Sequence, residues 1–188
     1  MQTIHLSAAP GIEPRRIQNN TLRSQATPLN THVDMDETLA EILLSRNWTV
    51  SLAESCTGGL VCATLTELSG SSEWFERGYI TYSNEAKTEC LGVPAELIEA
   101  HGAVSEAVAK AMAEGARVNS GSNVAISITG VAGPSGGTSE KPVGTVWFGW
   151  ATANQTLTKT MRFNGDRQKV REQATEFALA ELIALLRS

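Results

Sequence analysis

Residues 48–68, WTVSLAESCTGGLVCATLTEL, carry the pattern that decides the fold. The stretch opens with a strand-like run from Trp48 to Ala53, after which Gly58 and Gly59 begin a helical pattern. A buried strand, a glycine turn and a helix form the building unit of α/β proteins. Because strand and helix patterns alternate through the rest of the chain, we expect a single domain, an α/β three-layer α/β/α sandwich on a mixed β-sheet.

The remaining elements follow from the same alternation. Further strands are expected at 79–83, 124–129, 143–151 and 157–163, and helices near 37–43, at 85–91 and after the N-caps Ser105 and Asp166. Large and small residues alternate over 124–129, which predicts one face that accepts a close-packed helix. Residues 143–151 are apolar on both faces, as in a strand buried between two layers, whereas 157–163 alternate with threonines and charges, as in an edge strand.

Residues 1–33 differ in composition from the rest of the chain. They contain three prolines and no periodic apolar pattern, and they carry a formal charge of +2 against −7 for residues 34–188. Such a segment buries too little apolar surface to offset its ordering entropy. We therefore expect a flexible N-terminal tail over 1–33 and the folded domain over 34–188. An organelle-targeting peptide is the alternative, although the amphipathicity of the segment is weak.

Composition excludes several classes of protein. The chain has 188 residues with 41% hydrophobic content, which fits one domain, and a net charge of −5, which argues against a nucleic-acid partner. No apolar run is long enough to cross a membrane. Three cysteines without a CxxC pair favour a reduced, cytoplasmic compartment. With three histidines and no ligand cluster, neither a metal nor a cofactor is expected, and a homo-oligomer stays open.

The first candidate site follows the first strand, in Ala53–Gly59. Ligands of open α/β sheets bind at the carboxyl ends of strands. The helix start there offers main-chain N–H groups of Thr57, Gly58 and Gly59 to an oxyanion or phosphate, next to the Ser55 hydroxyl. An ordinary turn capped by Ser or Thr is the alternative. Cys56 at the same turn is a candidate thiolate, with a buried inert cysteine as the competing interpretation.

The second candidate site is Tyr79–Lys87. With Ile80 facing the core, Tyr82, Ser83 and Asn84 emerge at the strand end, and Lys87 falls in the first turn of the next helix. The helix dipole and burial both lower the pKa of a lysine at such a position. A neutral lysine serves as general base for a serine hydroxyl, while a surface lysine is the alternative.

Two further loops complete the candidate site. Thr129, Gly130 and Gly133 belong to a glycine-rich loop after a buried strand, which either wraps a ligand with N–H groups or is a plain connector. Lys141, beyond this loop, is a rival catalytic lysine or a solvated charge. Arg167 stands at the start of the last helix, where a cation is unfavourable unless an anion such as a phosphate binds it. Pairing of Arg167 with Asp166 or a nearby Glu is the competing explanation.

Seven motifs in one order resemble the CinA C-terminal domain family, the nicotinamide-nucleotide amidases. They are ESCTGG at 54–59, GSS at 70–72, residues 79–87, HGAVS at 101–105, SITGVAGP at 127–134, KPVGTV at 141–146 and GDR at 165–167. The resemblance runs from about Asp34 to the C-terminus.

The resemblance implies hydrolysis of the carboxamide of nicotinamide mononucleotide, a small-molecule nucleotide substrate. It implies Ser55 as nucleophile, Lys87 as its base, Tyr82 as an assisting hydroxyl and Arg167 as the residue that meets the substrate phosphate. The pyrophosphatase-like domain of longer relatives is absent from the 188 residues. A nucleotide-binding module without turnover and a cysteine hydrolase based on Cys56 are the alternatives.

Overall fold

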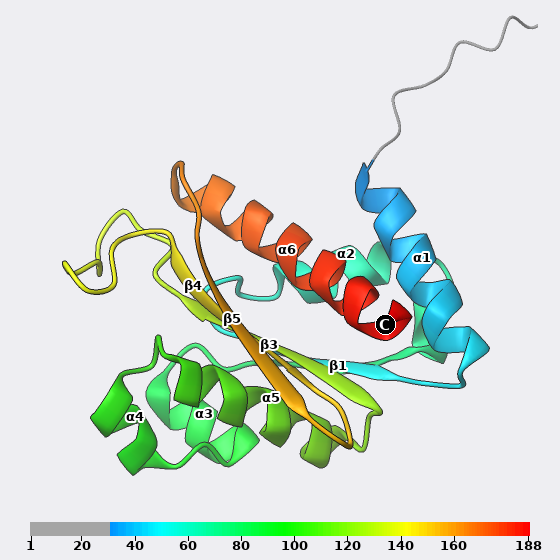
Figure 1. Ribbon diagram of the computed structural model, residues 1–188, viewed down its shortest axis with the longest axis horizontal. Coiled ribbons are helices and arrows are strands. Elements are labelled where there is room, and N and C mark those ends of the chain that lie inside the picture. Colours follow the sequence, from blue (N-terminus) through cyan, green and yellow to red (C-terminus); the bar gives the residue numbers. More distant parts are fainter. Residues whose placement is uncertain (1–30) are drawn as a thin grey trace, which may run out of the picture.

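Five strands form one mixed sheet in the computed structural model, which describes residues 31–188 (Figure 1). The strands are β1 (Val50–Glu54), β2 (Phe75–Ile80), β3 (Val124–Gly130), β4 (Thr145–Ala151) and β5 (Thr156–Arg162). Their order is β2-β1-β3-β4-β5, with β1 parallel to β2 and β3, and β4 antiparallel to β3 and β5. The three parallel strands therefore end at the same edge of the sheet.

Helices cover both faces of the sheet (Figure 1). Helices α1 (Thr31–Ser45), α2 (Leu60–Glu67) and α6 (Arg167–Arg187) lie on one face, and α3 (Asn84–Leu91), α4 (Ala95–His101) and α5 (Glu106–Ser120) lie on the other. A short 3-10 helix, η1, spans Ser71–Glu73. This arrangement confirms the three-layer α/β/α sandwich on a mixed sheet.

Two apolar clusters fill the spaces between the layers. Val124, Ile126 and Ile128 belong to the cluster under α1, α2 and α6, whereas Ala125 belongs to the cluster under α5. The Ser127 hydroxyl on the α5 side donates to the carbonyl of a residue in that helix. The alternation of large and small residues in β3 therefore places α5 close to the sheet, as predicted.

The N-caps of the two longest helices after the first are confirmed. The Ser105 hydroxyl accepts the Val108 N–H at 3.3 Å, and the Asp166 carboxylate accepts the Lys169 N–H at 2.9 Å. Each side chain satisfies one main-chain donor that the first helical turn leaves without an intrahelical partner. The predicted edge position of β5 and the internal position of β4 are also confirmed.

The predicted second strand was placed too late in the sequence. Strand β2 spans Phe75–Ile80 instead of 79–83, and Ile80 is 48% exposed rather than facing the core. Gly78 interrupts the strand pattern, yet it is required there, because a Cβ at this position would lie 2.2 Å from the Cys62 Sγ of α2. A strand glycine often marks such a close approach.

Two other boundaries differ from prediction, and one helix was not predicted. Helix α1 begins at Thr31, ahead of the expected domain start at Asp34, and the rest of the predicted tail lies outside the described residues. Helix α4 was not predicted, and His101 is its last residue. Strand β4 begins at Thr145 rather than 143. Between residues 31 and 188, no helix has the length and hydropathy that a membrane span needs.

Candidate active site

The Ser55 hydroxyl lies at the carboxyl edge of the three parallel strands. The Ser55 N–H donates to the Ile128 carbonyl of β3 at 2.9 Å, so Ser55 extends the β1–β3 ladder by one residue. On the other side, the Thr81 N–H donates to the Glu54 carbonyl at 2.9 Å and extends the β1–β2 ladder. Ser55 is therefore held at the point where β1 leaves the sheet.

A cavity opens at this edge. Among the predicted site residues, its lining includes Ser55, Tyr82, Asn84, Lys87, Thr129, Gly130 and Arg167. These residues come from the ends of β1, β2 and β3 and from the starts of α3 and α6. The edge was predicted as the ligand site because parallel strands present their loops there.

Lys87 reaches Ser55 from inside the protein. Its side chain is only 1% exposed, and its Nζ lies 3.2 Å from the Ser55 Oγ, 2.8 Å from the Thr81 carbonyl oxygen and 3.4 Å from the Ser83 carbonyl oxygen. The two carbonyls accept two N–H donors. A neutral amine has two such donors and one lone pair, so the three contacts leave the lone pair for the Ser55 hydroxyl.

The protein environment favours that neutral form. Burial lowers the pKa of Lys87 because the ammonium loses its hydration. Nearby Cys56 acts in the opposite direction but has the smaller effect. Within residues 31–188, no carboxylate forms an ion pair with Lys87. The alternative of a solvated surface lysine is therefore wrong.

The main-chain N–H groups at the start of α2 have hydrogen-bond partners within the protein, which was not expected. The Gly59 N–H donates to the Glu54 carboxylate at 2.8 Å, and the Gly58 N–H donates to the Ser55 carbonyl at 3.1 Å. Both donors are therefore occupied within the protein, and the prediction that they hold an oxyanion gains no support from these contacts. Sequence reasoning assigned Glu54 no role, since an acid beside a turn gives no sign of whether it is buried.

Thr57 lies behind the turn and not in the cavity lining. Thr57 is fully buried, and its Oγ1 has no hydrogen-bond partner among the described residues. The Thr57 carbonyl accepts a hydrogen bond from the Arg171 Nη2 at 2.7 Å. Arg171 was also missed by sequence reasoning. The N–H groups of Cys56 and Thr57 face the Cys56 sulfur, and these contacts lower the thiol pKa against the larger effect of burial.

Arg167 connects three segments around the cavity. Its Nη1 donates to the Gly133 carbonyl at 2.9 Å, and its Nη2 donates to the Tyr82 hydroxyl at 2.8 Å. The competing explanation of an ion pair is not met among the described residues, and Asp166 caps the helix instead. Since a guanidinium has five N–H donors, three stay available to a ligand.

The other predicted residues have identifiable partners. The Ser83 hydroxyl caps α3 by accepting the Ala86 N–H at 3.0 Å, and the Thr129 hydroxyl donates to the Ala103 carbonyl at 2.8 Å. The rival lysine, Lys141, donates to the His101 carbonyl at 2.8 Å and is not part of the cavity lining. Lys87 is therefore the lysine that the structure brings to Ser55.

Cys56 borders the cavity as a buried free thiol. Burial raises the pKa of the Cys56 thiol to about 12, with a smaller contribution from the charge of Glu54. A thiol with so high a pKa is protonated near neutral pH and is a poor nucleophile.

Replacement of Cys56 by alanine should therefore leave kcat for the amide hydrolysis that the sequence resemblance implies within a few-fold of the wild-type value. Steady-state ammonia release by purified Cys56→Ala measures this. Loss of activity in Cys56→Ala, combined with an active Ser55→Ala protein, would transfer the nucleophile role to the thiol.

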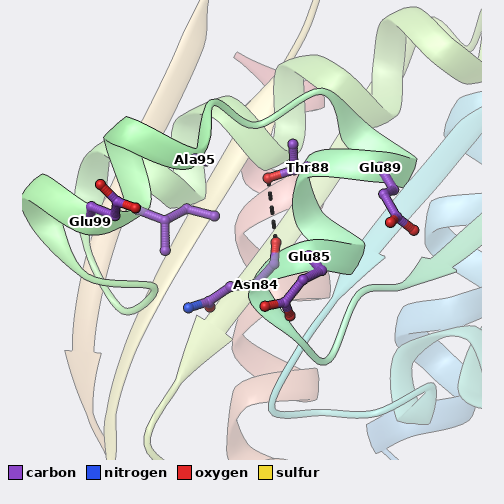
Figure 2. A pocket seen from close by; sticks show the side chains of 7 residues that line it. Asn84, Glu85, Thr88, Glu89, Ala95 and Glu99 are labelled. Atoms are coloured by element: carbon purple, nitrogen blue, oxygen red, sulfur yellow. Dashed lines mark hydrogen bonds between the residues drawn. The ribbon is translucent and has the colours of Figure 1, made fainter.

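A second hollow lies between α3 and α4 and shares Asn84 with the cavity. Figure 2 shows Glu85, Glu89 and Glu99 around it, with the Thr88 hydroxyl donating to the Asn84 carbonyl at 3.5 Å. The Thr88 hydroxyl has no lysine or histidine beside it among the residues that line this hollow, and the three carboxylates repel a phosphate. An anionic substrate group therefore fits the Arg167 side of the cavity better.

Comparison with known proteins agrees with this geometry. Residues 32–186 match the family model for the CinA C-terminal domain. The chain belongs to the CinA C-terminal domain family. Among curated members of this family, the chain is 51% identical over 151 residues to the nicotinamide-nucleotide amidohydrolase PncC of Escherichia coli (strain K12), covering 80% of this chain and 92% of PncC.

Longer CinA relatives and solved structures match as well. The chain is 52% identical to a CinA-like protein of Geotalea daltonii over 77% of this chain but only 35% of that protein. The crystal structure of the competence damage-inducible protein A (ComA) from Klebsiella pneumoniae superposes with a TM-score of 0.81 at 41% identity, covering 84% and 98% of the two chains. A competence/damage inducible protein from Agrobacterium tumefaciens gives a TM-score of 0.77 at 42% identity, covering 82% and 96%.

Proposed function

We propose that this chain hydrolyses the carboxamide of nicotinamide mononucleotide to nicotinate mononucleotide and ammonia, with Ser55 as nucleophile and Lys87 as general base. The observation that carries the proposal is the buried Lys87 amine 3.2 Å from the Ser55 Oγ. The 51% identity to a nicotinamide-nucleotide amidohydrolase supports the substrate. The three free cysteines suit a reducing compartment such as the cytoplasm. We place the reaction there, in pyridine-nucleotide salvage.

Acylation of Ser55 is the first chemical step. The neutral Lys87 Nζ takes the hydroxyl proton while the Ser55 Oγ bonds to the carboxamide carbon. The carbonyl oxygen becomes an oxyanion in the tetrahedral intermediate. Because the Gly58 and Gly59 N–H groups donate to protein oxygens, we assign its stabilisation to the N–H groups of Cys56 and Thr57, which would exchange the weak sulfur acceptor of Cys56 for the oxyanion.

Expulsion of ammonia and hydrolysis of the ester complete the cycle. The C–N bond breaks as the nitrogen receives a proton from the Lys87 ammonium, either directly or through the Tyr82 hydroxyl, which gives up its own proton and takes one from Lys87. Either route leaves Lys87 neutral for the second step. Tyr82 accepts a hydrogen bond from Arg167, which leaves its own hydroxyl hydrogen for the departing nitrogen. Water then attacks the acyl-serine carbon while the neutral Lys87 Nζ takes a water proton. As the ester C–O bond breaks, Lys87 returns this proton to the Ser55 Oγ, which restores the hydroxyl and the neutral amine.

The substrate phosphate is assigned to Arg167. Three free guanidinium donors and a site away from the acidic hollow support this assignment. Asn84, Thr129 and Gly130 complete the wall around the nicotinamide ring. Gly133 was predicted to bind the substrate, but it is not part of the cavity lining, and we assign it a positioning role instead because its carbonyl accepts the Arg167 Nη1.

Removal of the Arg167 side chain should weaken recognition of the phosphate. A charge-assisted hydrogen bond contributes roughly 1.5–3 kcal/mol, so we expect Arg167→Ala to raise KM for the mononucleotide about 10- to 150-fold. Nicotinamide riboside, which has no phosphate, should be a poor substrate whose kcat/KM changes little. Lys169→Ala is the matched control, since Lys169 is an exposed cation of the same first turn. Equal losses on both substrates would make Arg167 structural.

Ammonia release across a panel of pyridine nucleotides and nucleosides tests the function itself. The proposal predicts the highest kcat/KM for nicotinamide mononucleotide and one nicotinate mononucleotide formed per ammonia. Saturable binding of the mononucleotide without ammonia release would indicate a binding module instead.

A further inference from the structure

The Glu54 side chain is buried between the strand that precedes Ser55 and the start of helix α2. Glu54 is the last residue of β1, precedes Ser55 and is 0% exposed. Its Oε2 accepts the Gly59 N–H at 2.8 Å and the Val61 N–H at 3.3 Å, and its Oε1 accepts the Cys62 N–H at 2.8 Å. The carboxylate thus ties the strand before Ser55 to the helix after it.

The main chain of Glu54 is connected to Lys87 through Thr81. Its carbonyl accepts the Thr81 N–H at 2.9 Å, and the Thr81 carbonyl in turn accepts the Lys87 Nζ at 2.8 Å. Glu54 therefore contacts the turn that carries Ser55 through its side chain, and its main chain is connected to Lys87 through one intervening residue, Thr81.

An ordinary helix cap does not explain this arrangement. Surface Ser, Thr, Asp or Asn side chains satisfy one or two donors at a helix start, as Ser83, Ser105 and Asp166 do here. Burial of a carboxylate costs far more free energy than such a cap requires. The cost is understandable if the geometry of the Ser55 turn depends on both carboxylate oxygens.

We propose that Glu54 is a positioning residue that fixes the Ser55 Oγ relative to the Lys87 Nζ. The proposal rests on the amidase function given above. It also implies that the positive end of α2 is occupied by a protein carboxylate, so substrate anions bind elsewhere. A displacement of reacting groups by about 1 Å lowers rates roughly 10²-fold.

Glu54→Gln is the informative variant, because it keeps the shape of the side chain. One oxygen becomes an NH₂ group that faces main-chain N–H donors, so at least one of the three hydrogen bonds is lost. We expect kcat for nicotinamide mononucleotide to fall about 10²-fold, with KM changed less than about threefold. Glu67→Gln, the same change at the exposed end of α2, should keep wild-type kcat.

A second readout does not depend on the substrate. With a sulfonyl fluoride, the Ser55 Oγ forms a bond to sulfur, fluoride leaves, and Lys87 takes the hydroxyl proton. The labelling rate of Ser55 in Glu54→Gln should fall by a factor similar to that of kcat. Absence of ammonia release by the wild-type protein, with normal labelling of Ser55, would remove the proposed function but leave the labelling rates to decide on Glu54.

Circular dichroism and thermal unfolding establish that each variant is folded at the assay temperature. Glu54→Asp, which keeps the charge on a shorter side chain, serves as the second variant and should also lose kcat without a matching change in KM. Wild-type kcat and labelling in folded Glu54→Gln would overturn the proposal. Failure of both variants to fold would also overturn it, because Glu54 would then contribute to stability alone. So would a wild-type Ser55 that reacts neither with nicotinamide mononucleotide nor with the sulfonyl fluoride.

Discussion

Ser55→Ala should lower the rate of ammonia release from nicotinamide mononucleotide by about 10⁴- to 10⁶-fold. Losses of this size are typical when the nucleophile of a nucleophile–base unit is removed. The Ser55 Oγ lies 3.2 Å from the Lys87 Nζ, at the carboxyl edge of the sheet, and no other hydroxyl among residues 31–188 forms a hydrogen bond with the lysine. Comparison of kcat for the wild-type and variant proteins measures the loss.

The loss should come without a loss of substrate binding. Ser55 contributes its main-chain N–H to the β1–β3 ladder, and alanine keeps that hydrogen bond. We therefore expect calorimetric titration of Ser55→Ala with the mononucleotide to give a dissociation constant near the wild-type KM. A variant that binds the nucleotide and keeps wild-type kcat would exclude Ser55 as nucleophile.

Lys87→Met should cause a loss of similar size. Methionine fills nearly the same volume but cannot accept the proton of the Ser55 hydroxyl. The matched control is Lys169→Met, a lysine in an exposed first turn whose side chain pairs with Glu172. Thermal unfolding of Lys87→Met separates loss of the base from loss of the fold.

The wild-type pH profile tests the same role with the protein intact. Because the base must be neutral, kcat/KM should rise with pH through the pKa of Lys87 and then become constant. Burial lowers this pKa, so the rise should be centred below the ordinary lysine value of about 10.4. The rise should disappear in Lys87→Met. A profile that falls with rising pH would mean that the charged ammonium, and not the amine, is required.

Much of the fold could be predicted from periodicity. The strand, glycine turn and helix over residues 48–68 appeared where expected, and the alternation in β3 predicted the close approach of α5. Strand β2 was misplaced because Glu76, Arg77 and Gly78 resemble a turn. On an edge strand such polar residues are exposed, and the glycine accommodates Cys62.

The site was only partly predictable for a different reason. Residues such as Ser55 and Lys87 stand at strand ends and helix starts, which sequence patterns locate well. Partners that depend on tertiary packing were not predicted. Glu54 accepts the Gly59 N–H that had been assigned to the substrate, and Arg167 is held by Tyr82 and Gly133. A hydrogen bond between residues 85 positions apart leaves no local signal in a single sequence.

Acid quenching during turnover of nicotinamide mononucleotide, followed by mass spectrometry of the peptide that contains Ser55 and Cys56, tests the serine–lysine amidase most directly. The predicted result is a nicotinate mononucleotide acyl group on Ser55 that persists in Cys56→Ala and is absent from Ser55→Ala. An acyl group on Cys56, lost in Cys56→Ala while Ser55→Ala still releases ammonia, would contradict the assignment of Ser55 as nucleophile.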